Sequence, residues 1–183
     1  MSLPPTERHN SETVLGFFSV TRIAFLHSAM YNAYFTERRV IFAKLGGVLI
    51  PPTSYSPANP LAGLAWASTE GKRVKKRLAA QNEYGKMTPQ EIADREDNVA
   101  VLYYDILSVR VKGVRQPSIS FVFTRKQKLG WDKIDFSLLT DPGALEGNLQ
   151  AAGKILRRFL PGKIDNQLKD TKYDHSREIF ERG

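Results

Sequence analysis

Two short apolar stretches, 32–35 and 40–45, flank a polar turn in the first quarter of the chain. From Asn32 to Leu45 the sequence reads NAYFTERRVIFAKL. Aromatic and β-branched residues on both sides of four polar residues predict a β-hairpin with its turn at 36–39. Successive positions of the second stretch face opposite ways and both sets are largely apolar, which predicts a central strand buried on both faces. We expect most later elements to pack on this hairpin.

Five further stretches have the alternation or the composition of strands. One lies within 13–25, where β-branched and aromatic side chains favour strand over helix. The other four follow Asn98 and read VAVLYYDI, SVRVKGV, PSISFVF and KIDFSLL. An amphipathic helix is predicted from Asp141 to about Leu160. Its apolar stripe consists of Leu145, Leu149, Ala152, Ile155, Leu156 and Phe159.

This order predicts a mainly β fold with α, in which about seven antiparallel strands form a small barrel or sandwich and the last helix covers one end. A long insertion, 46–98, separates the third and fourth strands. It contains a proline-rich loop, a basic helical stretch over 61–84, and a second short helix. Thr88, Pro89 and Glu91 have the spacing of a capping box with proline in the first turn.

The chain is therefore expected to form one domain, 13–160, that includes the helical insertion 46–98. A flexible N-terminus, 1–12, precedes it. A charged C-terminal tail, or a short last helix, follows at 161–183.

Two motifs indicate a family. The stretch NAYFTERRVIFAK resembles a motif of bacterial pleckstrin-homology-like (PH-like) proteins, in which an aromatic strand and a Thr-x-Arg-Arg turn precede a strand of Val, Ile and Phe. YYDILSVRVKG, from Tyr103 to Gly113, is similar to the family's second marker. The resemblance covers Thr13 to Leu160 apart from the insertion. It implies a PH-like barrel of two near-orthogonal antiparallel sheets capped by the C-terminal helix.

The resemblance does not by itself imply a ligand. Relatives that bind phosphoinositides do so through basic residues between the first two strands. Here that stretch is Leu26-His27-Ser28-Ala29-Met30, which has no Lys or Arg. Phosphoinositide binding in that mode is therefore not expected.

Composition narrows the class of protein. The net charge of +8 makes an anionic partner plausible. The absence of cysteine excludes disulfides, thiolate metal sites and cysteine nucleophiles, and fits a reducing compartment. The first residues have no secretory pattern, and prolines interrupt the uncharged stretch 45–69, so that no transmembrane segment is expected. These features predict a cytoplasmic protein, peripheral at the membrane if it binds one.

The sharpest local feature is a basic cluster in the insertion: Lys72, Arg73, Lys75, Lys76 and Arg77. At helical spacing these side chains cover more than half of the circumference and leave Val74 and Leu78 as an apolar pair. One interpretation is a helix that binds anions or a membrane surface, with Leu61, Leu64 and Trp66 as interfacial residues. The other is a solvated helix that packs Val74 and Leu78 on the β-domain.

A secondary basic loop contains Arg125, Lys126 and Lys128. With Trp131 nearby as a ring that could stack on a base, it would add to a nucleic-acid surface, although basic turns between strands are common. In the hairpin turn, Arg38 and Arg39 are better explained by structure. One of them is expected to pair with an acidic group such as Asp105.

No pattern of a catalytic, cofactor or metal site is visible. The three histidines, His9, His27 and His175, are too far apart for metal-ligand spacing. The sequence has no glycine-rich phosphate loop, nucleophile elbow or paired-carboxylate signature. Asp94, Glu96 and Asp97 have the pattern of a solvated helix end. We predict no catalytic residues, no cofactor and no metal.

The sequence therefore predicts a non-enzymatic interaction module that binds a protein partner or an anionic membrane surface. Exposed sheet edges leave a homo-oligomer open. Nucleic-acid binding through the basic insertion is the alternative. An enzyme of unknown class is the least favoured interpretation.

Overall fold

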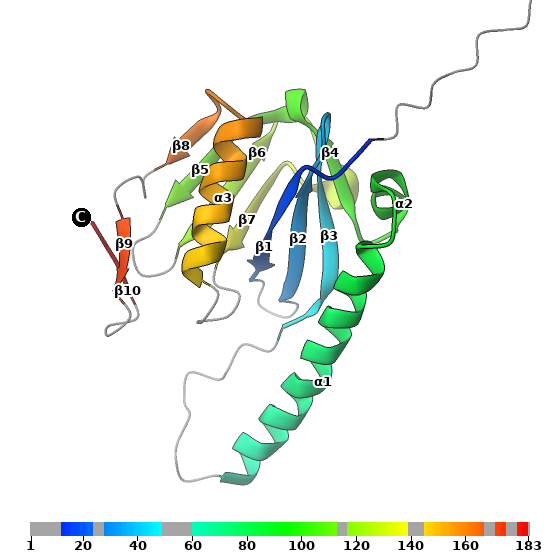
Figure 1. Cartoon of the computed structure of the whole chain (residues 1–183), viewed down its shortest axis with the longest axis vertical. Coiled ribbons are helices and arrows are strands. Elements are labelled where there is room, and N and C mark those ends of the chain that lie inside the picture. The colour runs from blue at the N-terminus through cyan, green and yellow to red at the C-terminus, as the bar shows by residue number, and fades with distance from the viewer. Residues whose placement is uncertain are drawn as a thin grey trace, which may run out of the picture.

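The computed structural model describes residues 12–23, 28–48, 60–112, 117–138, 145–166, 171–174 and 179–182. Seven strands make up the larger part of this structure (Figure 1): β1 Gly16–Arg22, β2 Ala29–Phe35, β3 Arg39–Gly47, β4 Val99–Leu102, β5 Ile106–Lys112, β6 Ser118–Phe123 and β7 Lys133–Ser137. Three short strands follow near the C-terminus: β8 Ile164–Asn166, β9 Thr171–Asp174 and β10 Ile179–Arg182. The helices are α1 Pro60–Tyr84, α2 Pro89–Asp94 and α3 Leu145–Phe159, with short 3₁₀ turns at Tyr103–Asp105 and Lys128–Gly130.

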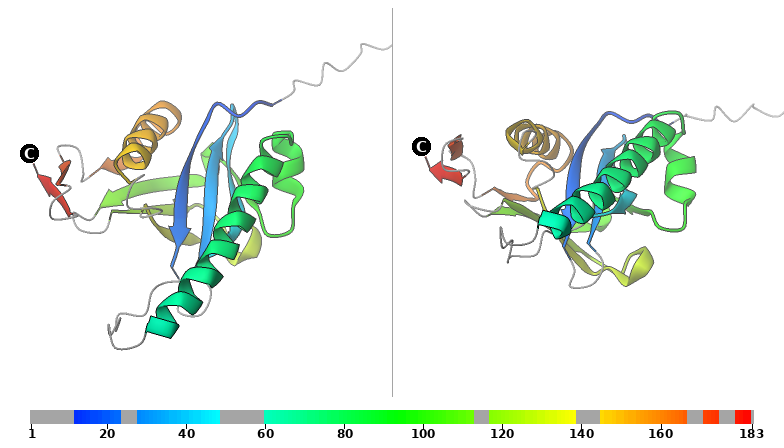
Figure 2. Two further views of the ribbon diagram at one scale, coloured as in Figure 1. Left: turned by 60° about the horizontal axis from the view of Figure 1, so that its bottom comes forward. Right: turned by 90° about the horizontal axis from the view of Figure 1, so that it is seen from below.

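Eight strands form one mixed sheet in the order β4-β3-β2-β1-β7-β6-β5-β8. The strands β1 to β4 are an antiparallel meander, and β5 to β7 are a second one. A single pairing, Thr21 opposite Ser137, joins β1 to β7. Figure 2 shows β1–β3 running at a steep angle to β5, so the sheet bends over on itself. The predicted mainly β fold with α is confirmed.

The predicted hairpin at 32–45 is confirmed. Phe35 lies opposite Val40 in the β2–β3 register, with the four-residue turn between them. The Thr36 side-chain oxygen accepts a hydrogen bond from the Arg39 N–H at 3.1 Å, and the Thr36 N–H donates to the Arg39 carbonyl at 3.0 Å. Threonine at the first turn position thus supplies the local bonds that close the turn.

The larger core lies between the two halves of the bent sheet. Phe42 on β3 has no exposed surface, and its ring centroid lies 5.1 Å from that of Phe121 and 5.2 Å from that of Phe136. The helix α3 covers this core with Ala152 and Leu156, and Leu160, directly after the helix, also belongs to the core. These contacts confirm the described part of the predicted apolar stripe; its first positions, Leu145 and Leu149, have side chains outside the described residues.

An aromatic group closes the corner where α3, β2 and the turn before β5 meet. The ring of Phe35 lies 6.4 Å from that of Tyr103 and 5.6 Å from that of Phe159. The Tyr103 hydroxyl donates to the Thr36 carbonyl at 2.7 Å. Burial raises the pKa of Tyr103 above its ordinary value.

We expect the Tyr103→Phe variant to lose less of its free energy of unfolding at alkaline pH than the wild type does. In the unfolded chain a tyrosine deprotonates near pH 10, whereas folded Tyr103 keeps its proton, so raising the pH above about 10 favours unfolding. The contribution is fully present below that pH. Urea unfolding at about pH 8 and about pH 11 should show a smaller difference for the variant than for the wild type. An equal difference would contradict the role of Tyr103.

A smaller core lies on the outer face of β2 and β3, where α1 and α2 pack. It contains Tyr34, Ile41, Ala43, Leu45, Tyr84 and Ile92. Val40 and Phe42 belong to the larger core, so β3 is buried on both faces as predicted. The capping box at the start of α2 is also confirmed, because the Thr88 side chain accepts from the Glu91 N–H and the Glu91 carboxylate accepts from the Thr88 N–H.

The expectation that a turn arginine pairs with an acidic group is confirmed, but the suggested partner, Asp105, is wrong. Arg39 instead forms a two-point contact with Glu12, with Arg39 Nη2 2.6 Å from Glu12 Oε2 and Nε 3.2 Å from Oε1. Asp105 is bound by Arg125 at 2.9 Å. The reason is topological. The residues before β1, which include Glu12, lie beside the hairpin turn, whereas Thr124 and Arg125 follow β6 and lie next to Asp105. Of the segment 1–12, predicted to be flexible, only Glu12 is among the described residues.

The chain after α3 does not form the suggested tail or last helix where the structure describes it. Ile164–Asn166 forms β8, which pairs in parallel with Val109–Val111 of β5. The Val109 N–H donates to the Lys163 carbonyl at 2.8 Å, and the Lys163 ammonium donates to the carbonyls of Tyr103 and Ile106. The edge of β5 therefore provides partners for this segment. β9 and β10 form a separate hairpin.

Candidate functional site: the exposed face of the insertion helix

The helix α1 is attached to the sheet by its second half only. It has 25 residues, which corresponds to about 37 Å at 1.5 Å per residue. Near the end of α1, the Tyr84 hydroxyl lies 3.0 Å from the Lys44 carbonyl oxygen of β3, and Ala80 packs on the smaller core. Figure 1 shows the first turns of the helix running past the end of the sheet. This half of α1 has no strand beneath it.

Two of the five clustered basic residues face the sheet. Arg77 Nη2 lies 2.5 Å from Glu70 Oε1, and Arg77 Nη1 donates to the Gly47 carbonyl at 3.0 Å. Arg73 lies beside the same end of β3. If Gly47 carried a Cβ atom, the Arg73 Nη1 would lie 3.4 Å from it. Gly46, with φ +148°, adopts a conformation that L side chains rarely adopt, and the Arg77 side chain passes beside it. Arg77 therefore binds α1 to the end of β3, and Arg73 lies beside it.

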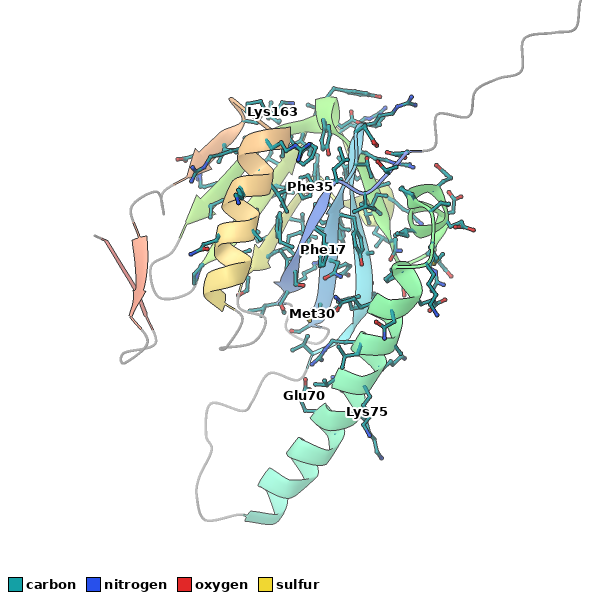
Figure 3. The ribbon with its side chains drawn as sticks, in the orientation of Figure 1. Phe17, Met30, Phe35, Glu70, Lys75 and Lys163 are labelled. Carbon is teal, nitrogen blue, oxygen red and sulfur yellow. The ribbon has the colours of Figure 1, made fainter. Side chains whose placement is uncertain are left out.

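The remaining three, Lys72, Lys75 and Lys76, are exposed, and we call them the basic face of α1. Lys75 and Lys76 follow Lys72 by three and four residues, which places the three side chains side by side on the helix surface. Among the described residues, none of the three has an ion-pair partner. Figure 3 shows Glu70 on the side of α1 toward the sheet and Lys75 on the opposite side.

The apolar pair Val74 and Leu78 does not pack on the β-domain, so that part of the solvated-helix interpretation is wrong. Val74 is 39% exposed and Leu78 is 55% exposed. The positions that α1 turns toward the sheet are instead Arg73, Arg77, Ala80 and Tyr84, at spacings of three and four. The apolar pair therefore lies beside the basic face on the open surface. Leu61, Leu64 and Trp66 belong to α1, but their side chains lie outside the described residues.

A groove of about 740 Å³ lies between α1, the end of β3 and the turn after α2. Its charged groups are largely paired: Lys44 Nζ lies 3.1 Å from Asp97 Oδ2, and Arg95 binds Glu83. Hydrogen bonding to Glu83 raises the pKa of Arg95. Glu96 and Lys76 also line the groove. It therefore has carboxylates and cations in equal number.

Asn98 holds the back of this groove together. Its Oδ1 accepts the Lys44 N–H at 2.9 Å, and its Nδ2 donates to the Ile92 carbonyl at 2.7 Å. The Tyr84 hydroxyl lies 3.3 Å from the same Oδ1. Side chains thus satisfy the backbone of Lys44 where β3 extends past the end of β4.

The secondary basic loop is only partly open. Arg125 binds Asp105, and the Lys128 ammonium donates to the Arg95 carbonyl at 2.6 Å, whereas Lys126 is exposed. Trp131 is 4% exposed, and the Arg22 guanidinium lies 5.2 Å above its ring. The suggestion that this ring stacks on a base is therefore wrong, because its faces are covered within the protein.

No family model, curated protein or solved structure matches the chain. The function is therefore inferred from the geometry of the site.

Metal and membrane features can be stated for the described part of the chain. There, no group of three or more His, Asp or Glu residues is placed to hold a metal ion. All three histidines, and residues 24–27 between β1 and β2, lie outside the described residues. The helices within the described ranges also lack the combination of length and hydropathy needed to cross a bilayer.

The sequence interpretation missed the two groups that orient the cluster. Glu70 precedes Arg77 by seven residues, which is two helical turns, so the spacing was available as a signal. The Gly47 carbonyl had no sequence signal, because it depends on where α1 crosses β3. Asp94, Glu96 and Asp97 are exposed, as predicted for a solvated helix end, and Asp97 in addition binds Lys44 on β3.

Proposed function

We propose that this chain is a PH-like module. The order β1 to β4 and then β5 to β7, the steep angle between the two halves of the sheet, and the position of α3 over the core all support that proposal. They are the features that the motifs at 32–44 and 103–113 imply. The insertion that carries α1 is the main departure from a minimal domain.

We further propose that the module binds an anionic membrane surface through α1. The observation that carries this proposal is the exposure of an apolar pair, Val74 and Leu78, directly beside the basic face. A bilayer with anionic lipids offers negative charge to the lysines and an apolar layer to Val74 and Leu78 at one interface. The charge is not cancelled within the protein, because the basic face has no ion-pair partner among the described residues.

The expected contact is weak and reversible. A lysine near an anionic surface contributes about 1 kcal/mol, so the basic face contributes about 3 kcal/mol. Partial burial of Val74 and Leu78 adds to this at about 25 cal/mol per Å² of apolar surface removed from water. The first turns of α1 can reach a surface without a clash from the sheet, since they run past the ends of β1–β3. A protein partner with an acidic surface could use the same charge, but the exposed apolar pair favours a bilayer.

Reversal of two charges tests the proposal. Lys75→Glu with Lys76→Glu should lower binding to anionic vesicles at least tenfold, because about 1 kcal/mol is lost for each of several unit charges. Binding of the wild type should also fall as salt is added. Co-sedimentation of the full chain with phosphatidylglycerol-containing and purely phosphatidylcholine vesicles measures both effects.

The matched control is Lys126→Glu with Lys154→Glu. Both lysines are exposed and lie outside α1, and the pair changes the net charge by the same amount. The control should keep most of its binding. An equal loss in both double variants would contradict a site on α1, and so would equal retention of the wild type on anionic and neutral vesicles. Absence of binding to either vesicle would favour a protein partner instead.

A further inference from the structure

The proposal that follows rests on the proposed membrane function. We propose that α1 responds to the density of negative charge on a membrane and not to the identity of the headgroup. Its partner would then be any sufficiently anionic bilayer. Two observations support this: which basic residues remain free, and how the neighbouring groove is charged.

Within the basic cluster of α1, the exposed residues without an ion-pair partner are all lysines. A lysine ammonium is a hydrated point charge on a flexible stem, whereas the arginine guanidinium offers a planar fork that matches a phosphate group at two points. On α1 both arginines face the sheet, where Arg77 is engaged by Glu70 and by the Gly47 carbonyl. The guanidinium of Arg77 is therefore in use within the protein, and that of Arg73 lies beside the end of β3.

The lysines also lie on a convex surface. All three lysines are exposed, but Figure 3 shows Lys75 on the side of α1 away from the sheet, whereas Lys76 borders the groove, so the three ammonium groups do not converge on one point. Discrimination between headgroups requires several donors fixed around one ligand, as in a concave site. Long exposed side chains without partners keep their rotamer freedom and can follow charges that move within the bilayer plane.

The groove beside the basic face does not supply such a concave anion site. Lys44 is paired with Asp97, and Arg95 is paired with Glu83. The negative charge of Glu96 offsets the positive charge of Lys76, since both line the groove. A phosphate that entered would have to displace carboxylates that already make these contacts. It would also meet the remaining negative charge at short range, which opposes binding.

The experiment compares headgroups at equal charge. Full-length chain is sedimented with phosphatidylcholine vesicles that contain phosphatidylglycerol, phosphatidylserine, cardiolipin or a phosphoinositide, each mixed to the same formal negative charge per vesicle area. We expect binding constants that agree within about threefold, and a steep common dependence on the anionic fraction. Soluble inositol hexakisphosphate at a concentration too low to change ionic strength should not compete.

Paired variants distinguish the two surfaces. Lys72→Gln with Lys75→Gln should weaken binding to all four vesicles by a similar factor, about thirtyfold for two lost charges at about 1 kcal/mol each. Lys44→Gln with Arg95→Gln, which removes the two paired cations of the groove and keeps Lys76, should leave binding to all four vesicles unchanged. A preference of more than about tenfold for one headgroup, or loss of that preference in the groove variant, would overturn this inference while membrane binding stands. Failure to bind any anionic vesicle would overturn both proposals.

Discussion

Phe42→Ala is expected to lower the free energy of unfolding by about 4 kcal/mol. The side chain has no exposed surface and contacts the rings of Phe121, Trp131 and Phe136. These neighbours come from β6, β7 and the residue pair before β7, in the half of the bent sheet opposite β3, so they cannot close in on the vacated space without moving strands. The loss therefore includes the transfer free energy of the ring and the cost of the cavity. Urea unfolding followed by circular dichroism measures it.

Phe17→Ala provides the matched control. Phe17 lies on β1 of the same sheet but is 44% exposed, and it contacts the ring of Tyr34 from the solvent side. We expect a cost of about 1 kcal/mol, since much of its surface is already hydrated in the folded state. A loss at Phe42 no larger than the loss at Phe17 would show that the core is not where the structure places it.

Asn98→Ala is expected to cost about 3 kcal/mol. The side chain is fully buried and bonds the Lys44 N–H and the Ile92 carbonyl, which belong to β3 and α2. Alanine removes both bonds and leaves two backbone groups without partners in a buried position. A buried unsatisfied group costs about 1–3 kcal/mol, which is more than the net value of the bond itself. The substitution should therefore loosen the attachment of α1 and α2 to β3.

Hydrogen exchange makes the test specific. The Lys44 amide should exchange faster in Asn98→Ala, while amides of the larger core keep their relative protection. Asn82→Ala is the control, because Asn82 is exposed on α1 and alanine suits a helix, so its effect should stay within about 0.5 kcal/mol of zero. Unchanged exchange at Lys44 would contradict the role of Asn98, whatever the global stability.

Side chains of the insertion attach it to the backbone of β3. Asn98, Tyr84 and Arg77 bind the backbone of β3 at Lys44 and Gly47. This part of the strand edge is therefore occupied from within the chain, and α1 is held at a defined angle. The proposed binding surface consequently lies on a helix whose second half is fixed to the sheet and whose first turns project beyond it.

Local pattern was sufficient for the elements whose signal lies in neighbouring residues. The hairpin at 32–45, the two-sided burial of β3 and the capping box of α2 follow from alternation, turn chemistry and the spacing of Thr88 and Glu91. These features involve contacts over a few residues, and side-chain direction there is set by backbone geometry. The same holds for the described part of the apolar stripe of α3.

Contacts between distant segments could not be predicted in this way. A sequence shows that Arg73, Arg77, Val74 and Leu78 lie on different faces of α1, but the face that meets the sheet depends on the crossing of α1 over β3. The apolar pair was the obvious choice for burial, yet Tyr84 and Ala80 fill the apolar contact and Arg77 finds a carbonyl at Gly47. The choice of Glu12 over Asp105 as the partner of Arg39 has the same origin.

The sequence by itself thus determined that this is a β-rich domain with a basic helical insertion, because periodicity and turn residues are local properties of the chain. Only the tertiary structure decided which of the basic residues are free. Packing against β3 engages Arg77 and turns Arg73 toward the sheet, while Lys72, Lys75 and Lys76 stay in solvent beside an exposed apolar pair. The physical reason is that an ion pair or a buried contact depends on distances across the fold, which chain order does not specify.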